Sequence, residues 1–528
     1  MAEYLAPGVY IEEIARGPTP IEGVSTSTAA LLGETERGPV QPQLVTSYTQ
    51  YARLYGGPFK PGKYLPHAVA SFFENGGRRC YICRIASLTA QAGAVAYPWA
   101  VITARGPGDW SGHLYIKILT GSTSRRKPEN SVRIQLAFWR ADNVPDNVAD
   151  GDVATDPFMP RSTIKPAPYM TEVFDDIDLV DTASPDHFSK RISGSSALID
   201  MAALSPLEPA PSGAVTLPLT VFAGGGNGGA ITVADFGNDE DNEPDRKKWQ
   251  GLRALELDQY RDVSLVYAPH PADDDAQTIA KRVISHCEKN RFRFAVVDAF
   301  KGKSNPNDEY LDPRTTLTDT KYGALYYPWI SVAEPGTGAQ VVIPPGGSVL
   351  GIYARSDNER GVFKAPANEI VRGALALEFD VDDGAQEILN PKSVNVIRQF
   401  PGRGIRLWGA RTLSSDALWK YVSVRRLFIF LEASIFEGTQ WVVFEPNDER
   451  LWARVKDTIR LFLRSQYRLG ALMGATEAEA FQIICDRNTM TQDDILNGRL
   501  VCHVGIAPVR PAEFVVFKIY QSTVEAQT

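Results

Sequence analysis

The stretch most suggestive of chemistry is Gly224–Gly229, with the sequence GGGNGG. Glycine-rich turns can present backbone N–H groups to a phosphate. This turn follows the strand-like sequence LPLTVFA, but no Lys-Ser or Lys-Thr pair follows it, so it is not a P-loop. Its spacing also differs from the G-x-G-x-x-G of dinucleotide-binding proteins. Two interpretations remain: a flexible turn that returns an inserted segment to the core, or a binding site for a phosphorylated ligand in an α/β enzyme.

Cysteine and histidine form no recognisable metal or nucleophile motif. Cys80 and Cys83 make a single C-x-x-C pair, whereas a structural zinc site needs four ligands. The sequence CYIC predicts a strand, in which positions i and i+3 point to opposite faces and cannot share a metal. The six histidines are scattered and form no H-E-x-x-H motif, and no G-x-S-x-G nucleophile elbow is present. We therefore expect no metal, no cofactor and no catalytic residue.

A more specific pattern lies near the C-terminus, in a segment predicted to be a helix from about 448 to 469. Basic residues recur there at every fourth position, and on a helix each such step turns by about 40°, which gives one slowly winding stripe. The stripe consists of Lys456, Arg460, Arg464 and Arg468. An apolar stripe beside it consists of Val455, Ile459, Phe462, Leu463 and Leu469. The basic residues form either a solvated face or a docking face for an acidic partner.

Length and composition limit the class of protein. The 528 residues suggest about three to four domains, and the 44% hydrophobic and 22% charged content is ordinary for a globular protein. The net charge of −8 argues against nucleic-acid binding. No apolar run approaches the roughly 18 residues of a membrane span, and the first residues lack the basic region of a signal peptide. Five cysteines suit a reducing compartment better than a disulfide scaffold.

Hydrophobic periodicity predicts a mixed α+β, multi-domain chain. An α/β pattern opens it, with strands at 28–35 and 78–86 and helices at 47–57 and 65–77. The pattern returns after residue 245, where a strand, a helix and a strand form a β-α-β unit over 262–300. Helices at about 414–436 and 448–469 close the chain.

The region between the two α/β parts differs in texture. Strands are predicted at 114–119 and 131–139, and the stretch 141–186 is rich in proline and aspartate. We therefore expect an inserted, β-rich and loop-rich domain over 90–220.

Both ends of the sequence contain apolar, strand-forming residues with no local partner. The first run includes Val9, Tyr10 and Ile11. The second includes Phe514, Val516, Phe517 and Ile519. Terminal segments usually fray and are polar, so these runs indicate ends that join a sheet. That sheet belongs either to the same molecule or, by strand addition, to a neighbour.

Several long stretches resemble the tail sheath proteins of contractile phage tails and phage-tail-like particles. The opening YLAPGVYIEEI resembles the family's beginning, and FAGGGNGG followed by TVADF resembles a family junction in which Asn227 replaces a common Asp. The resemblance covers both ends and the C-terminal third, but the 90–220 insertion matches poorly. The stretches that carry it in the C-terminal third are VFKAPAN (362–368), NVIRQFPGRGIRLWGARTL (395–413), YVSVRRLF (421–428), WVVFEPND (441–448) and GIAPVRPAEFVVFKI (505–519).

This resemblance implies a structural subunit that polymerises helically around an inner tube and contracts to drive the tube through a target membrane. Its partners would be further copies of itself, the inner tube protein, and baseplate and terminal cap proteins, with no nucleic acid and no direct membrane insertion. Such a protein would assemble in the bacterial cytoplasm as part of a phage tail or a phage-tail-like particle. The terminal runs would then pair with neighbouring subunits, and the helix carrying the basic stripe would face the tube.

The expected domain organisation follows from the same reasoning. We expect an N-terminal arm (1–27), a middle α/β domain (28–89 with 221–365) and an inserted outer β-rich domain (90–220). A C-terminal inner, tube-facing domain (366–510) and a C-terminal arm (511–528) would complete the chain.

Overall fold

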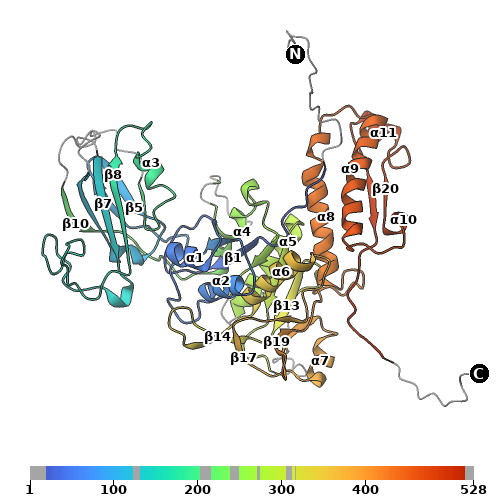
Figure 1. Cartoon of the computed structure of the whole chain (residues 1–528), viewed down its shortest axis with the longest axis horizontal. Coiled ribbons are helices and arrows are strands. Elements are labelled where there is room, and N and C mark those ends of the chain that lie inside the picture. Colours follow the sequence, from blue (N-terminus) through green and yellow to red (C-terminus); the bar gives the residue numbers. More distant parts are fainter. Residues whose placement is uncertain are drawn as a thin grey trace, which may run out of the picture. The chain divides into compact units, whose positions relative to one another are not determined.

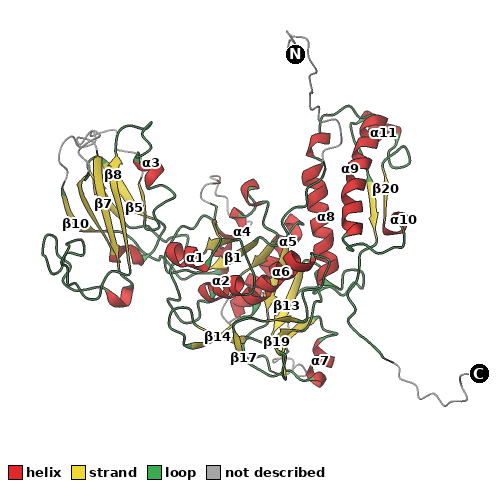
Figure 2. Cartoon of the chain, in the orientation of Figure 1, coloured by secondary structure: helices red, strands yellow, loops and turns green. Residues whose placement is uncertain are grey.

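A computed structural model of the chain (Figures 1 and 2) describes residues 20–122, 131–201, 216–237, 246, 249–269, 274–304, 312–314 and 317–517. The chain forms two compact units, which are described separately. The core unit comprises Ser25–Arg360 and Ala365–Val422. The C-terminal unit comprises Met1–Val24, Gly361–Lys364 and Ser423–Thr528.

A nine-stranded sheet organises the core unit. Six neighbouring strands, from β18 to β3, are parallel, and antiparallel strands flank them on both sides. The order is β16 (Glu369–Ile370), β19 (Gly404–Leu407), β18 (Val394–Phe400), β13 (Gly323–Tyr327), β12 (Phe294–Asp298), β11 (Leu265–Tyr267), β1 (Ala29–Gly33), β3 (Cys80–Arg84) and β2 (Gln43–Val45). The parallel strands β1, β11, β12 and β13 are buried at every position, as expected for strands covered on both faces.

Helices cover the sheet and confirm the predicted α/β pattern. Helix α5 (Asp274–Asn290) links the parallel strands β11 and β12, and its residues Val283 and Cys287 pack in one core cluster with Val266 of β11. Helix α1 (Tyr48–Tyr55) begins after Ser47, whose side chain accepts a hydrogen bond from the Gln50 N–H, and ends at Gly56. The sequence predicted this helix over 47–57.

Helices α2 (Leu65–Glu74) and α6 (Gly346–Arg360) pack closely on each other. The contact depends on glycine: a Cβ at Gly347 would lie 2.5 Å from the Ala68 carbonyl oxygen. Beside this contact, the buried Asp298 carboxylate accepts hydrogen bonds from the Tyr267 hydroxyl (2.6 Å) and the Gly346 N–H (2.9 Å). Burial raises the pKa of Asp298 to about 7 despite these two bonds.

Smaller elements complete the α/β part of the core unit. Strands β15 (Gln340–Ile343), β14 (Ile330–Ala333) and β17 (Ala374–Leu377) form a separate antiparallel sheet. Helices α4 (Gly251–Ala254) and α7 (Asp383–Leu389) are short.

The predicted β-rich insertion folds into two antiparallel sheets around a common apolar core. One sheet has the order β10 (Leu217–Val221), β6 (Leu114–Thr120), β7 (Ser131–Phe138) and β8 (Met170–Asp178). The other has the order β4 (Ala94–Tyr97), β5 (Ala100–Ala104) and β9 (Ile199–Met201). Helix α3 (Phe188–Arg191) precedes β9 in the sequence. The strand predicted at 131–139 is β7, and its alternating apolar residues Val132, Ile134, Leu136 and Phe138 are all buried in this core.

Two long helices dominate the C-terminal unit: α8 (Val422–Gly438) and α9 (Glu449–Arg468). They pack with α10 (Glu477–Ala480), β20 (Phe481–Ile484), α11 (Gln492–Leu496) and β21 (His503–Ile506) around one apolar cluster, which Ile21 also joins. The prediction that the first long helix begins at 414 is wrong. The Thr412 N–H donates to the Lys420 carbonyl and Arg411 pairs with Tyr421, so residues 412–420 form a loop.

The structure also places one domain boundary differently from the expected one. Strands β16, β17, β18 and β19 belong to sheets of the core unit, so residues 365–422 group with that unit rather than with the C-terminal helices. A sequence reading that relies on local patterns cannot see that a strand at 394–400 pairs with β13, because the pairing is long-range. Within the described residues, no helix is long and apolar enough to cross a membrane.

Candidate functional sites: a basic helix, a small sheet and an exposed terminal segment

Helix α9 presents the predicted basic stripe on its exposed side. The Asp448 carboxylate caps the helix by accepting a hydrogen bond from the Leu451 N–H at 2.8 Å. Four predicted members of the apolar stripe are at most 4% exposed: Val455, Ile459, Phe462 and Leu463. The fifth, Leu469, is 65% exposed because it ends the helix, so its assignment to the apolar stripe is wrong.

The four basic side chains lie on one surface but are not equivalent. Lys456, Arg460 and Arg468 are exposed. Arg464 instead makes two hydrogen bonds to Glu477 of α10, at 2.6 and 3.1 Å, and Arg460 lies 3.8 Å from the same carboxylate. The hydrogen bond from Arg464 lowers the pKa of Glu477. The cations most available to an acidic partner are therefore Lys456 and Arg468, at the two ends of the stripe.

Further cations on α9 were missed by reading the sequence at steps of four. The helix carries six basic and two acidic residues, and the basic residues outside the stripe are Arg450 and Arg454. The Arg454 guanidinium lies 4.6 Å from the centre of the Trp441 ring and 3.7 Å from the Glu445 carboxylate. A count of charges over the whole helix, rather than along one stripe, would have found them.

Strands β20 and β21 form a two-stranded antiparallel sheet with no third strand among the described residues. Phe481 pairs with Ile506 and Ile484 with His503. On β21 the residues from His503 to Gly505 are exposed. Each strand thus has one edge whose backbone N–H and C=O groups are open to further pairing, a feature that proteins usually protect. This small sheet is a candidate acceptor for an added strand.

The segment from 511 to 517 belongs to no helix or strand (Figure 1). It contains four adjacent apolar side chains that are 67–85% exposed: Phe514, Val515, Val516 and Phe517. Exposure of such a run of apolar side chains to water is unfavourable. The other residues predicted to form arm strands, Val9, Tyr10, Ile11 and Ile519, lie outside the described residues.

The Gly224–Gly229 loop behaves as a structural turn. The Gly226 N–H donates to the Gln91 carbonyl at 3.0 Å, and the Gly229 N–H donates to the Thr89 hydroxyl at 3.1 Å. The Asn227 side chain accepts a hydrogen bond from the Asp109 N–H at 3.2 Å. The Gly226 and Gly229 amides join the end of the insertion to its beginning, so these two are not free to bind a phosphate. This geometry favours the turn interpretation.

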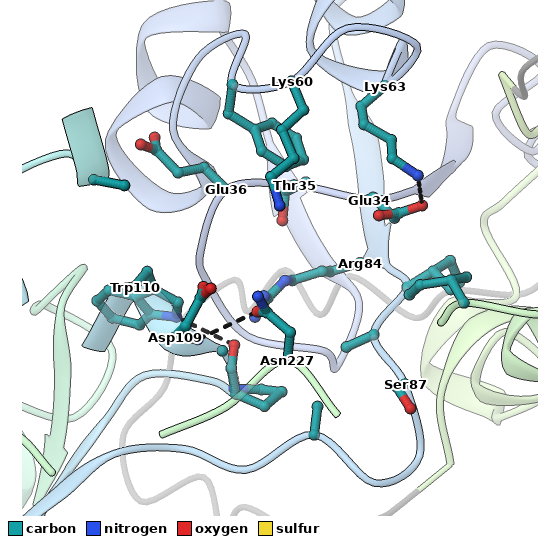
Figure 3. Close-up of a pocket in the computed structure, with 18 of the residues that line it drawn as sticks. Glu34, Thr35, Glu36, Lys60, Lys63, Arg84, Ser87, Asp109, Trp110 and Asn227 are labelled. Carbon is teal, nitrogen blue, oxygen red and sulfur yellow. Dashed lines mark hydrogen bonds and ion pairs between the residues drawn. The ribbon is translucent and has the colours of Figure 1, made fainter. Parts of the chain in front are cut away.

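A polar pocket of about 560 Å³ lies beside this loop, between the insertion and the α/β part of the core unit (Figure 3). Three of its basic side chains have partners within the chain. Lys63 forms an ion pair with Glu34, Arg140 lies 2.7 Å from Glu36, and the buried Arg84 donates to the Gly38 carbonyl. Burial lowers the pKa of Arg84 to about 10. The exposed Lys60 also lines the pocket, and it has no ion pair among the described residues.

The C-x-x-C pair lies on strand β3, as predicted. Cys83 packs in the core cluster that includes α5, whereas Cys80 does not belong to that cluster. Both thiols are buried, and burial raises the pKa of each. Over the part of the chain that the structure describes, no group of three or more His, Cys, Asp or Glu residues could hold a metal ion.

Comparisons with known proteins identify sheath domains in this chain. Residues 249–413 match the phage tail sheath protein central domain, and residues 414–522 match the phage tail sheath C-terminal domain. A major tail sheath protein of a Pseudomonas aeruginosa (strain UCBPP-PA14) prophage is 25% identical over 255 residues, which is 47% of this chain and 63% of the relative. The tail sheath protein of Salmonella phage ViI is 25% identical over 210 residues, 38% of this chain and 32% of the relative. Each match thus spans less than two-thirds of the relative's length.

Solved structures share the fold over nearly the whole chain. The sheath complex of an extracellular contractile injection system (PVC) in its contracted state covers 100% of both chains with a TM-score of 0.58 and 23% identity. The contracted helical sheath of the anti-feeding prophage covers 98% of this chain and 99% of the other with a TM-score of 0.56 and 23% identity. The matched proteins are structural sheath proteins, and none of these comparisons supports the enzyme alternative.

Proposed function

We propose, from the premise that this chain belongs to the phage tail sheath family, that it is the structural subunit of a contractile sheath. It polymerises helically around an inner tube and contracts to drive the tube through a target membrane. The observation that carries this proposal is the pair of adjoining sheath domains, which together span residues 249–522. The fold shared with contracted sheaths supports it.

Strand exchange between subunits is the proposed means of assembly. Two features complement each other. The segment 514–517 is apolar and exposed, and the β20–β21 sheet has only two strands and so has open edges. We expect the C-terminal arm (511–528) and the N-terminal arm (1–27) to pair with such sheets in neighbouring subunits. Head-to-tail contacts that do not close into a ring produce a helical filament.

Contraction needs no nucleotide under this proposal. The extended assembly is a kinetically trapped state, and contraction releases free energy as rigid subunits rotate while the arms keep them connected. The Gly226 and Gly229 amides of the glycine-rich loop are engaged within the chain, which supports this proposal.

The inner tube protein is the proposed partner of helix α9. Lys456 and Arg468 project from it without an ion pair in the described structure. Exposed ion pairs contribute about 0–1 kcal/mol each, so a partner held this way can be released. Repetition over many subunits would still fix its register. The β-rich insertion (90–220) is the proposed outer domain, with little part in the lattice.

The remaining partners are further copies of the chain and the baseplate and cap proteins at the ends of the sheath. We propose assembly in the bacterial cytoplasm as part of a phage tail or a tail-like particle, with no nucleic acid bound and no insertion of the subunit into a membrane.

Negative-stain electron microscopy of the purified chain tests this function. The proposal predicts hollow cylinders with a regular helical surface. Monodisperse protein that binds a nucleotide saturably, and loses that binding when Gly226 and Gly228 are changed to alanine, would instead favour the enzyme.

A further inference from the structure

Two cysteines face each other at the end of the small sheet. The antiparallel register pairs Ile483 with Val504 and Ile484 with His503. One further step of the same register places Cys485 directly opposite Cys502. Residues opposite each other in an antiparallel pair have Cα atoms about 4.5–5.5 Å apart. This separation lies within the range of about 4.4–6.8 Å that a disulfide spans without moving the backbone.

The surroundings of the pair suit reversible oxidation. Cys485 is 4% exposed and belongs to the core cluster of the C-terminal unit, whereas Cys502 is partly exposed and packs against that cluster. The interaction between the two thiols lowers the pKa of Cys485 and raises that of Cys502. Lys456 of α9 also favours the thiolate of Cys485. The thiolate is the reactive form of cysteine, and Cys502 gives an oxidant access to the pair.

The other three cysteines provide a contrast within the same chain. Cys80, Cys83 and Cys287 are fully buried, and burial raises the pKa of each thiol. Cys80 and Cys83 lie on one strand at positions of opposite orientation. These three thiols are therefore expected to be inert towards mild oxidants.

We propose that Cys485 and Cys502 are a modification site, at which a small-molecule disulfide such as oxidised glutathione converts the two thiols into a cross-strand disulfide. One protein thiolate attacks the oxidant and releases one molecule of reduced glutathione, leaving a mixed disulfide. The second protein thiolate attacks the protein sulfur of that mixed disulfide and releases the second reduced glutathione. Two protein thiols are oxidised, one glutathione disulfide is reduced, and the two thiol protons end on the released thiols.

The disulfide would close the 16-residue segment 486–501, which contains α11, at the base of the β20–β21 sheet. It would stabilise this sheet mainly by constraining the unfolded chain. Resting on the proposed function, the consequence is that a particle in an oxidising medium would hold its strand-accepting sheet in one arrangement.

The test is oxidation of the purified full chain with oxidised glutathione, followed by thiol titration in denaturant and peptide mapping. The expected result is a fall from five free thiols to three and a linked peptide pair joining Cys485 to Cys502, both reversed by dithiothreitol. The variants Cys485→Ala and Cys502→Ser should give no linked pair, whereas the control Cys287→Ala should give it in full.

Five free thiols after oxidation, or a glutathione adduct that persists on Cys502, would overturn the proposal. Because the first measurement uses the unaltered chain, it holds even if a variant folds poorly. It is also independent of polymerisation, so failure of the proposed sheath function would leave this result readable.

Discussion

The largest and the smallest β-sheet of the described chain differ in how fully their strands are paired and buried. The nine-stranded sheet is buried under helices, and its central strands have partners on both sides. The β20–β21 sheet has two strands, and most side chains of β21 are exposed. A two-stranded sheet is marginal alone, so its stability depends on α9 beneath it and on whatever pairs with its edges. The large sheet maintains the fold, and the small one is the sheet that we propose for assembly.

Removal of residues 512–528 should have the largest effect, because it deletes the segment that we propose adds to the small sheet of a neighbouring subunit. Each backbone hydrogen bond contributes only about 1 kcal/mol net, but the loss recurs in every subunit. We expect a soluble subunit with an unchanged thermal melt and no cylinders in the electron microscope. Normal cylinders would remove the distinction between the two sheets.

Charge reversal on α9 should separate tube binding from polymerisation. The variant Lys456→Glu with Arg468→Glu changes the two ends of the basic stripe and leaves the Arg464–Glu477 pair intact. We expect the subunit to fold and to form empty cylinders, but not an extended sheath around a tube, as judged by microscopy after co-expression with the tube protein. As the matched control, Arg464→Gln should affect the tube-bound form less. Extended particles from the double variant would show that the stripe is a solvated face.

The buried Asp298 should give the large sheet a pH dependence that the small sheet lacks. Its pKa is raised from 3.8 to about 7, so between these values the folded chain keeps a proton that the unfolded chain has lost. Stability should therefore be greatest below pH 4 for this group and fall as the pH rises through 7, by on the order of a few kcal/mol. Denaturant unfolding of Asp298→Asn should lack this slope. An identical slope in the variant would assign the effect to other groups.

Two glycine substitutions compare how tightly the surroundings of the two sheets are packed, and they should have the smallest effects. Gly347→Ala places a methyl group 2.5 Å from the Ala68 carbonyl oxygen between α2 and α6, and should cost about 1–3 kcal/mol. Gly505→Ala on β21 meets no atom within 4 Å and should leave the unfolding free energy nearly unchanged. Equal losses in chemical denaturation would mean that the small sheet is as tightly packed as the core.

Sequence patterns predicted the elements whose cause is local. Helix α9 has an apolar face of regular spacing and the cap residue Asp448, and its bounds were predicted to within a residue. At Gly224–Gly229 the sequence left a turn and a phosphate site open, and the bonds of the Gly226 and Gly229 amides favour the turn.

Features that depend on distant residues were not predictable. The pairing of β18 with β13 joins residues about 70 positions apart and moved a domain boundary. Glu477 was not recognised as the partner of Arg464, because α10 reaches α9 only through the tertiary fold. The exposure of Leu469 follows from the exact end of its helix, which periodicity does not set.

Strand exchange between subunits is the central claim, and photo-crosslinking within the polymer tests it most directly. A photoreactive benzoylphenylalanine would replace Phe517, and cylinders would be assembled from an equal mixture of isotopically heavy and light chains. Strand exchange predicts crosslinked peptides that join position 517 to β20 or β21, with heavy–light pairs in the proportion expected from random mixing. Crosslinks found only between peptides of the same isotope would show that the segment pairs within its own chain, and would contradict strand exchange.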